Sequence, residues 1–191
     1  TLGIAYKDGI LLVSDRRITE KLMVAESVHK ISKIDDHVAG TFAGYTSDAR
    51  VLIKKCRVFA QQHKLTYGEP VDIEGVVKYV SDLEQAYTQY GGIRPFGIAF
   101  LFAGIDKRGS QLYETDPSGI YTQYLARAIG MGSTEANKLL ERKYKDGLKL
   151  EDAQKLALEV FKEILDKEFA LEKLEAATIT SKGTDMLKMS E

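Results

Sequence analysis

The chain has 191 residues, 44% of them hydrophobic and 29% charged, and this ordinary globular composition excludes a disordered or fibrous protein. Lys and Arg (27) nearly balance Asp and Glu (28), so a net charge of −1 offers no basic surface for a nucleic-acid backbone. The longest strongly apolar run, residues 97–105, is far shorter than the roughly 20 residues of a membrane-spanning helix. Because a single cysteine, Cys56, also fits a reducing compartment, we expect a soluble intracellular domain that contacts neither nucleic acid nor membrane.

Four strands are predicted in the first part of the chain. Residues 2–6 and 10–14 are apolar runs on either side of an Asp-Gly pair, an arrangement typical of a β-hairpin. A charged segment follows at residues 15–17. Residues 30–34 then alternate between apolar and polar side chains, and residues 38–43 form another apolar run.

Two amphipathic helices are predicted next. In residues 47–64 apolar side chains recur at helical spacing behind a capping hydroxyl at position 46 or 47. In the second helix, Asp72 caps an apolar stripe that ends at the glycine pair 91–92. Both stripes are wide enough to be buried on a sheet.

The remaining segments repeat this order. Strands are expected at residues 97–105, 111–114 and 121–128, helices at 133–144 and 150–167, and closing strands at 176–180 and 186–189. Runs of strands followed by runs of helices argue against a doubly wound parallel sheet. The sequence therefore predicts an α+β fold, a four-layer α-β-β-α sandwich of two antiparallel sheets flanked by helix pairs, in a single domain over residues 1–191.

Metal and phosphate sites find little support in the sequence. His29, His37 and His63 share no ligand spacing with one another or with Cys56, whereas a zinc site needs three or four converging ligands. The glycine-rich residues 130–133 precede a helix, whose N-terminus can hold an anion, but they lack the ending of a P-loop. We expect no metal and no cofactor, and we interpret residues 130–133 as a tight turn between a strand and a helix.

The N-terminus offers one chemical lead. A threonine with a free α-amine can act as a nucleophile with its own amine as the base, and such a site needs a nearby cation and a carboxylate that orients this cation. Thr1, Lys30 and Asp15 are the right residue types for these three roles. They are the candidate catalytic residues if the chain is an enzyme.

Several blocks along the whole chain resemble proteasome subunits. They include residues 7–12 (Lys-Asp-Gly-Ile-Leu-Leu), 15–19 (Asp-Arg-Arg-Ile-Thr) and 43–50 (Ala-Gly-Tyr-Thr-Ser-Asp-Ala-Arg). The most specific blocks are 65–70 (Leu-Thr-Tyr-Gly-Glu-Pro), 87–97 (Tyr-Thr-Gln-Tyr-Gly-Gly-Ile-Arg-Pro-Phe-Gly) and 116–119 (Asp-Pro-Ser-Gly), which are similar to α-type subunits. The resemblance implies the N-terminal-nucleophile sandwich fold, in agreement with the four layers predicted above.

Two departures favour the α type over the β type, whose subunits cut peptide bonds with an N-terminal threonine. By resemblance, that nucleophile lies four residues before the glycine that matches Gly3, whereas Thr1 lies two before it. A strand rises about 3.3 Å per residue, so the offset moves Thr1 by roughly 6–7 Å, too far for groups that must approach to about 3 Å. Phe169 also stands where active chains carry a serine hydroxyl in an Asp-x-x-Ser-Gly segment.

The resemblance further implies a non-catalytic role in protein degradation. Seven α-type subunits form an outer ring that stacks on β-type subunits, gates substrate entry and docks ATPase or other regulatory particles in the cytoplasm, and in the nucleus of eukaryotes. The helices at 47–64 and 72–90 are implied at ring contacts. Lys30 is implied to receive the C-terminal carboxylate of a regulator's tail, with Gly44 leaving room for the tail backbone and Tyr45 packing on an apolar residue. The gate segment that precedes this part of α-type chains is expected to be absent.

Three alternatives stay open at this point. The chain can be an active β-type threonine peptidase that uses Thr1, or a free-standing binding domain that forms no ring. Lys30 can also be a solvated lysine or a partner of Asp15, without a role in docking.

Overall fold

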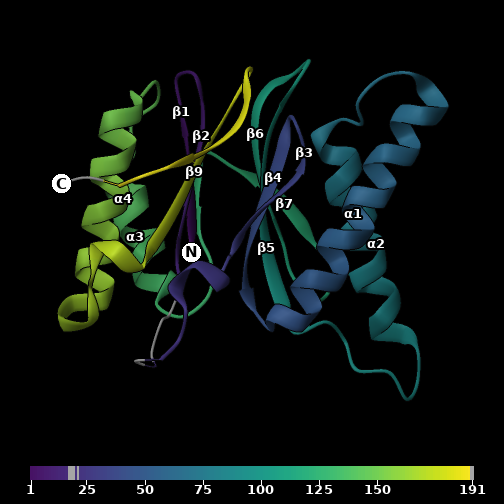
Figure 1. Ribbon diagram of the computed structural model, residues 1–191, viewed down its shortest axis with the longest axis horizontal. Helices are drawn as coiled ribbons and strands as arrows, with labels where there is room; N and C mark the ends of the chain where they lie inside the picture. Colours follow the sequence, from purple (N-terminus) through teal and green to yellow (C-terminus); the bar gives the residue numbers. More distant parts are fainter. Residues whose placement is uncertain (17–19, 21, 190–191) are drawn as a thin grey trace.

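The computed structural model describes residues 1–16, 20 and 22–189, and within this part the chain forms two antiparallel five-stranded sheets packed face to face (Figure 1). The first sheet has the order β10-β9-β2-β1-β8 and the second the order β3-β4-β5-β6-β7. The strands of the first sheet are β1 (Leu2–Tyr6), β2 (Gly9–Asp15), β8 (Ala126–Ala128), β9 (Leu174–Thr180) and β10 (Gly183–Leu187). Those of the second are β3 (Ile31–Asp35), β4 (Val38–Gly44), β5 (Ile98–Asp106), β6 (Gly109–Thr115) and β7 (Tyr121–Tyr124).

A pair of helices covers the outer face of each sheet (Figure 1). α1 (Thr46–Tyr67) and α2 (Ile73–Gln89) lie on the second sheet, and α3 (Ser133–Lys143) and α4 (Leu150–Leu165) lie on the first. Short 3-10 turns stand at η1 (Ala25–Ser27), η2 (Asp166–Glu168) and η3 (Leu171–Lys173). The α+β four-layer sandwich predicted from the sequence is confirmed.

Three apolar layers hold the sandwich together, and alternation along single strands supplies them. In β5, Phe100 and Phe102 point into the layer under α1 and α2, whereas Leu101 and Ala103 point into the layer between the sheets. Because both faces of such a strand are buried, its sequence is apolar without interruption. This accounts for the long apolar run at residues 97–105.

Local signals place the helix ends. The Asp72 side chain accepts a hydrogen bond of 2.9 Å from the Gly75 N–H and so caps α2. α1 ends at Tyr67 and is capped by Gly68, whose φ of +73° suits glycine and whose N–H donates to the Lys64 carbonyl.

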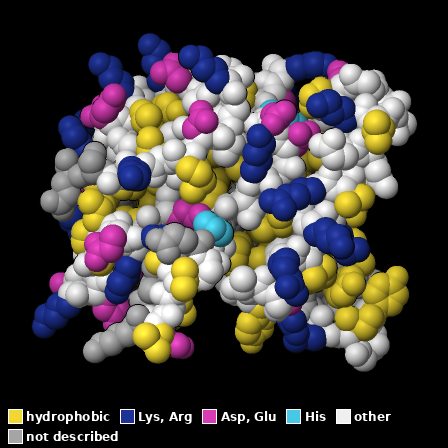
Figure 2. Space-filling view, in the orientation of Figure 1, with side chains coloured by type: hydrophobic (Ala, Val, Ile, Leu, Met, Phe, Trp, Pro, Cys, Tyr) yellow, Lys and Arg dark blue, Asp and Glu magenta, His cyan; other side chains and the backbone are white. Residues whose placement is uncertain are grey.

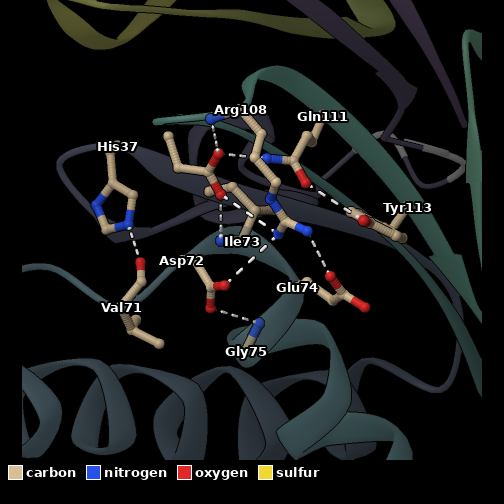
Figure 3. A network of polar contacts seen from close by, with 10 residues as sticks. His37, Val71, Asp72, Ile73, Glu74, Gly75, Arg108, Gln111 and Tyr113 are labelled. Atoms are coloured by element: carbon tan, nitrogen blue, oxygen red, sulfur yellow. Dashed lines mark hydrogen bonds and ion pairs between the residues drawn. The ribbon is translucent and has the colours of Figure 1, made fainter.

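A polar network fixes the start of α2 against the β5–β6 hairpin (Figure 3). The Asp106 carboxylate accepts hydrogen bonds from the backbone N–H groups of Ile73, at 3.0 Å, and Arg108, at 2.8 Å. The Arg108 guanidinium bonds in turn to Glu74 at 2.6 Å and lies 3.5 Å from Asp72. Asp106 thus satisfies the Ile73 N–H, one of the backbone donors that a helix start leaves without an intrahelical partner.

Three sequence expectations need correction. Residues 121–128 are not one strand: β7 ends at Tyr124 on the second sheet, and β8 begins at Ala126 on the first. The chain crosses between sheets at Leu125, whose carbonyl accepts a hydrogen bond from the Ala5 N–H, and side-chain pattern alone does not indicate such a change of partner strand. The closing strand is Gly183–Leu187 rather than 186–189, and the last helix ends at Leu165 rather than 167. The charged segment at 15–17 and the block at 15–19 lie partly outside the described residues.

Candidate functional site

A cavity of about 460 Å³ opens where the ends of strands from both sheets meet α3 and α4. Thr1, Asp15 and Lys30 line it together with Gly44, although these four residues come from separate parts of the chain. The remaining lining includes the turn that leads into α3 and apolar residues of α4. The structure thus brings together the three residues of the catalytic alternative and two of the three residues assigned to tail binding.

Thr1 directly precedes β1 and is held by contacts to neighbouring strands and to Ile129. Its carbonyl accepts a hydrogen bond of 2.9 Å from the Ile129 N–H, and its hydroxyl lies 2.6 Å from the Ser14 hydroxyl. The same hydroxyl lies 3.3 Å from the Phe42 carbonyl. The Thr1 hydroxyl thus contacts one strand of each sheet, through Ser14 of β2 and Phe42 of β4.

Lys30 stands immediately before β3, where the buried carboxylate of Glu175 holds the backbone. One oxygen of Glu175 accepts hydrogen bonds from the N–H groups of Lys30, at 2.7 Å, and Ile31, at 3.1 Å. Its other oxygen lies 3.1 Å from Nδ1 of His29. Sequence reasoning missed Glu175. The available signal was that Glu175 is the one charged residue of strand β9.

Gly44 and Tyr45 occupy different environments, although they are adjacent in sequence. Gly44 has a φ of +128°, and a Cβ atom there would lie 2.2 Å from the Gly97 carbonyl oxygen, so only glycine fits. The Tyr45 ring lies outside the cavity lining, packs over Gly97 and lies 5.2 Å from the Arg94 guanidinium. The side chain of Tyr45 is 62% exposed.

The glycine-rich residues 130–133 form the turn that the sequence predicts. Gly130 and Gly132 have φ values of +88° and +74°, and the Ser133 N–H donates to the Gly130 carbonyl at 3.1 Å. A side chain at Gly132 would meet Ile164 of α4 at 2.5 Å. The interpretation as a strand-to-helix turn is confirmed, and the same turn lines the cavity.

Phe169 serves packing. Its ring joins the apolar layer between the first sheet and the helices α3 and α4, and the Lys162 ammonium lies 5.6 Å from the ring centre. Asp166, the residue after the end of α4, has a φ of +45°. Position 169 therefore supplies no hydroxyl group.

The histidines and the cysteine have ordinary structural partners. His37 Nε2 lies 2.7 Å from the Val71 carbonyl, and His63 Nδ1 lies 3.2 Å from the Glu69 carbonyl. Burial raises the pKa of the Cys56 thiol to about 12. Among the described residues, we find no group of three His, Cys, Asp or Glu side chains arranged for a metal ion.

Over the same residues, no helix has both the length and the apolar character to cross a membrane.

The family model described as "Proteasome subunit" matches residues 1–179 of the chain. The chain belongs to the proteasome subunit family. The resemblance stated from the sequence blocks is therefore confirmed. It extends over the strands and helices that build the cavity.

Curated relatives place the chain within this family. A proteasome subunit alpha of Methanopyrus kandleri is 43% identical over 182 residues, which is 95% of this chain and 74% of the relative. Those of Methanocaldococcus jannaschii and Pyrococcus horikoshii are 45% and 46% identical, over 98% and 99% of this chain and 72% of each relative. These names support the structural α-type role over the catalytic β-type alternative.

Proposed function

We propose that the chain is a non-catalytic subunit of an outer proteasome ring. Seven such subunits stack on a ring of β-type subunits, gate the entry of substrates and dock a regulatory particle, in the cytoplasm. The α-type names of relatives that match nearly the whole chain support this role. The engagement of the Thr1 hydroxyl by Ser14 and the packing role of Phe169 argue in the same direction. On this proposal, residues 1–191 act as one subunit domain.

The cavity is the proposed docking point for a regulator's C-terminal tail. Its shared lining by Lys30 and Gly44 is the observation that carries this assignment. A lysine ammonium can bind the terminal carboxylate of an ATPase or other regulator, and charge-assisted hydrogen bonds are stronger than neutral ones. The N-terminal end of α3, which begins at Ser133 in the same lining, favours negative charge as well.

Tyr45 is proposed to contact the tail outside the cavity. Its exposed ring follows Gly44 directly in the chain, so a tail whose backbone passes Gly44 leaves the cavity beside this ring. Aromatic rings are effective partners for apolar side chains. This contact would supply apolar binding area in addition to the carboxylate.

The experiment replaces Lys30 in the assembled particle. We expect Lys30→Ala to weaken binding of a regulator tail peptide by about 1.5–3 kcal/mol, a roughly 10- to 150-fold loss. Ring assembly and basal peptide cleavage by the particle are expected to stay near normal. The matched control is Lys33→Ala, since Lys33 is half-exposed on β3 and pairs with Asp36 at 2.7 Å. A peptide that ends in an amide instead of a carboxylate should bind wild type and Lys30→Ala equally weakly. If Lys30→Ala particles bind the free-acid peptide as wild type does, the tail assignment is wrong.

A further inference from the structure

Glu175 is a buried carboxylate that spans the two sheets. It lies on β9 of the first sheet and is only 6% exposed, yet its hydrogen bonds go to the start of β3 in the second sheet. In the pairing of β2 with β9 it stands opposite Ser14, next to the pair formed by Asp15 and Leu174. Glu175 is therefore adjacent to the strand end that delivers Asp15 to the cavity.

The contacts of Glu175 converge on three consecutive residues. Its Oε2 atom accepts from the N–H groups of Lys30 and Ile31, and its Oε1 atom lies 3.1 Å from the imidazole of His29. A charged acceptor out of water makes stronger hydrogen bonds than a neutral one. The backbone of Lys30 is thereby attached to β9 one residue before β3 begins. This attachment fixes the position from which the Lys30 side chain extends.

We infer that Glu175 is a positioning residue that holds Lys30 in the cavity, by binding the backbone on both sides of the Lys30 Cα atom. This inference rests on the proposed docking of a tail carboxylate at Lys30. A carboxylate that needs an ammonium within hydrogen-bond distance loses affinity when the lysine backbone can shift by 1 Å or more. Glu175 itself does not contact the tail.

The test uses the assembled particle and a synthetic tail peptide with a free C-terminal carboxylate, measured by fluorescence anisotropy. Glu175→Gln keeps the size of the side chain but replaces the charged acceptor with a neutral amide. We expect it to weaken peptide binding by about 5- to 20-fold, and Glu175→Asp, which keeps the charge on a shorter side chain, to weaken it less. If Glu175→Gln fails to assemble, the peptide affinity of Glu175→Asp is compared with that of wild type instead.

A double-mutant cycle separates positioning from general stability. If Glu175 acts through Lys30, the double variant Lys30→Ala with Glu175→Gln binds the peptide no more weakly than Lys30→Ala alone. The matched control is Asp106→Asn, since Asp106 also accepts two backbone N–H groups but lies away from the cavity lining. It should lower the melting temperature without changing peptide affinity.

The outcomes distinguish this inference from the proposed function. Losses that multiply in the double variant, or wild-type affinity in Glu175→Gln, overturn the positioning role. If Lys30→Ala leaves peptide affinity unchanged, the docking proposal fails. The positioning role of Glu175 is then tested by the rate at which an amine-reactive ester labels Lys30. We then expect Glu175→Gln to change the Lys30 labelling rate, relative to that of Lys33, by at least threefold. An unchanged ratio would overturn the positioning role.

Discussion

Asp48 and Arg94 join the start of α1 to the segment that leads from α2 into β5. Arg94 Nη2 donates to Asp48 Oδ1 at 2.8 Å across 46 positions of sequence, and the Gly97 N–H donates to Asp48 Oδ2 at 2.9 Å. The Arg94 guanidinium also lies over the Tyr45 ring. One carboxylate, only 7% exposed, thus fixes the segment 94–97 next to the residue proposed to meet a regulator's tail.

We expect Asp48→Asn to lower the free energy of unfolding by about 1–2 kcal/mol at pH 7, because a charged acceptor with two donors is replaced by a neutral one. The Arg94 hydrogen bond holds the pKa of Asp48 below its usual value of 3.8. The stabilisation is therefore complete above that value and lost as the pH falls through the lowered one, so wild type and variant should converge in strong acid. Urea unfolding at several pH values measures this. Asp82→Asn, at an exposed position of α2, is the control and should change little. A constant difference down to pH 2 would contradict the prediction.

We expect Glu84 to give the free energy of unfolding a second pH dependence, opposite in sign to that of Asp48. This residue of α2 is completely buried, and burial raises the pKa of its carboxyl from 4.5 to about 8, with the Asp116 charge acting in the same direction. The folded chain holds the proton between these two values and the unfolded chain does not. Stability therefore falls as the pH rises from about 4.5 to 8, by up to about 1.4 kcal/mol per pH unit.

Glu84→Gln should abolish this slope, because an amide of similar size does not ionise. Above pH 8 the variant is expected to be more stable than wild type by roughly 2–4 kcal/mol. Urea unfolding between pH 5 and 9 measures both effects. Glu141→Gln, at an exposed position of α3, serves as the control. Parallel stability curves for wild type and Glu84→Gln would show that the carboxyl does not hold a proton in the folded chain.

The purified chain alone is expected not to hydrolyse fluorogenic peptides. The Thr1 hydroxyl is engaged at 2.6 Å by Ser14, and Phe169 supplies no hydroxyl near the end of α4. The measurement compares the chain, Thr1→Ala and a mock preparation over the same range of substrate. Turnover that Thr1→Ala abolishes and the mock preparation lacks would restore the catalytic alternative.

Ring formation is expected to depend on the exposed charges of α1. Figure 2 shows Lys and Arg side chains over the half of the molecule that carries α1. This helix has five basic residues and a single acidic one: Arg50, Lys54, Lys55, Arg57 and Lys64 against Asp48. Reversing two exposed charges, Arg50→Glu with Lys54→Glu, should reduce the ring in analytical ultracentrifugation more than it lowers the melting temperature, since exposed charges add little to stability.

The control for this prediction is Lys155→Glu, an exposed lysine on α4 at the opposite face of the sandwich. It should leave the ring intact. If the α1 variant loses ring assembly only in proportion to its lower melting temperature, these charges matter for folding alone. A loss of the ring in Lys155→Glu would mean that net charge, not the surface of α1, controls assembly.

Local patterns in the sequence were sufficient to predict the four layers of this fold. The apolar run of β5, the stripes of α1 and α2 and the Asp-Gly hairpin turn each depend on residues a few positions apart, and burial on a sheet makes these patterns necessary. Residue chemistry grouped Thr1, Asp15 and Lys30 as a candidate N-terminal nucleophile site, and the family resemblance added Gly44 beside Lys30. The structure then placed all four in one cavity.

The tertiary structure alone decided the polar contacts that act at long range. No spacing rule pairs Asp48 with Arg94, or Glu175 with the backbone of Lys30 across 145 positions, because any polar residue in the sequence is equally compatible with water. The sheet change at Leu125 is likewise invisible in the side-chain pattern of residues 121–128, since hydrogen bonds to a strand neighbour do not depend on side-chain type. Burial on a sheet or helix face imposes a pattern of apolar residues that can be read over a few positions. The partner of a backbone N–H or of a carboxylate is known only once the chain has folded.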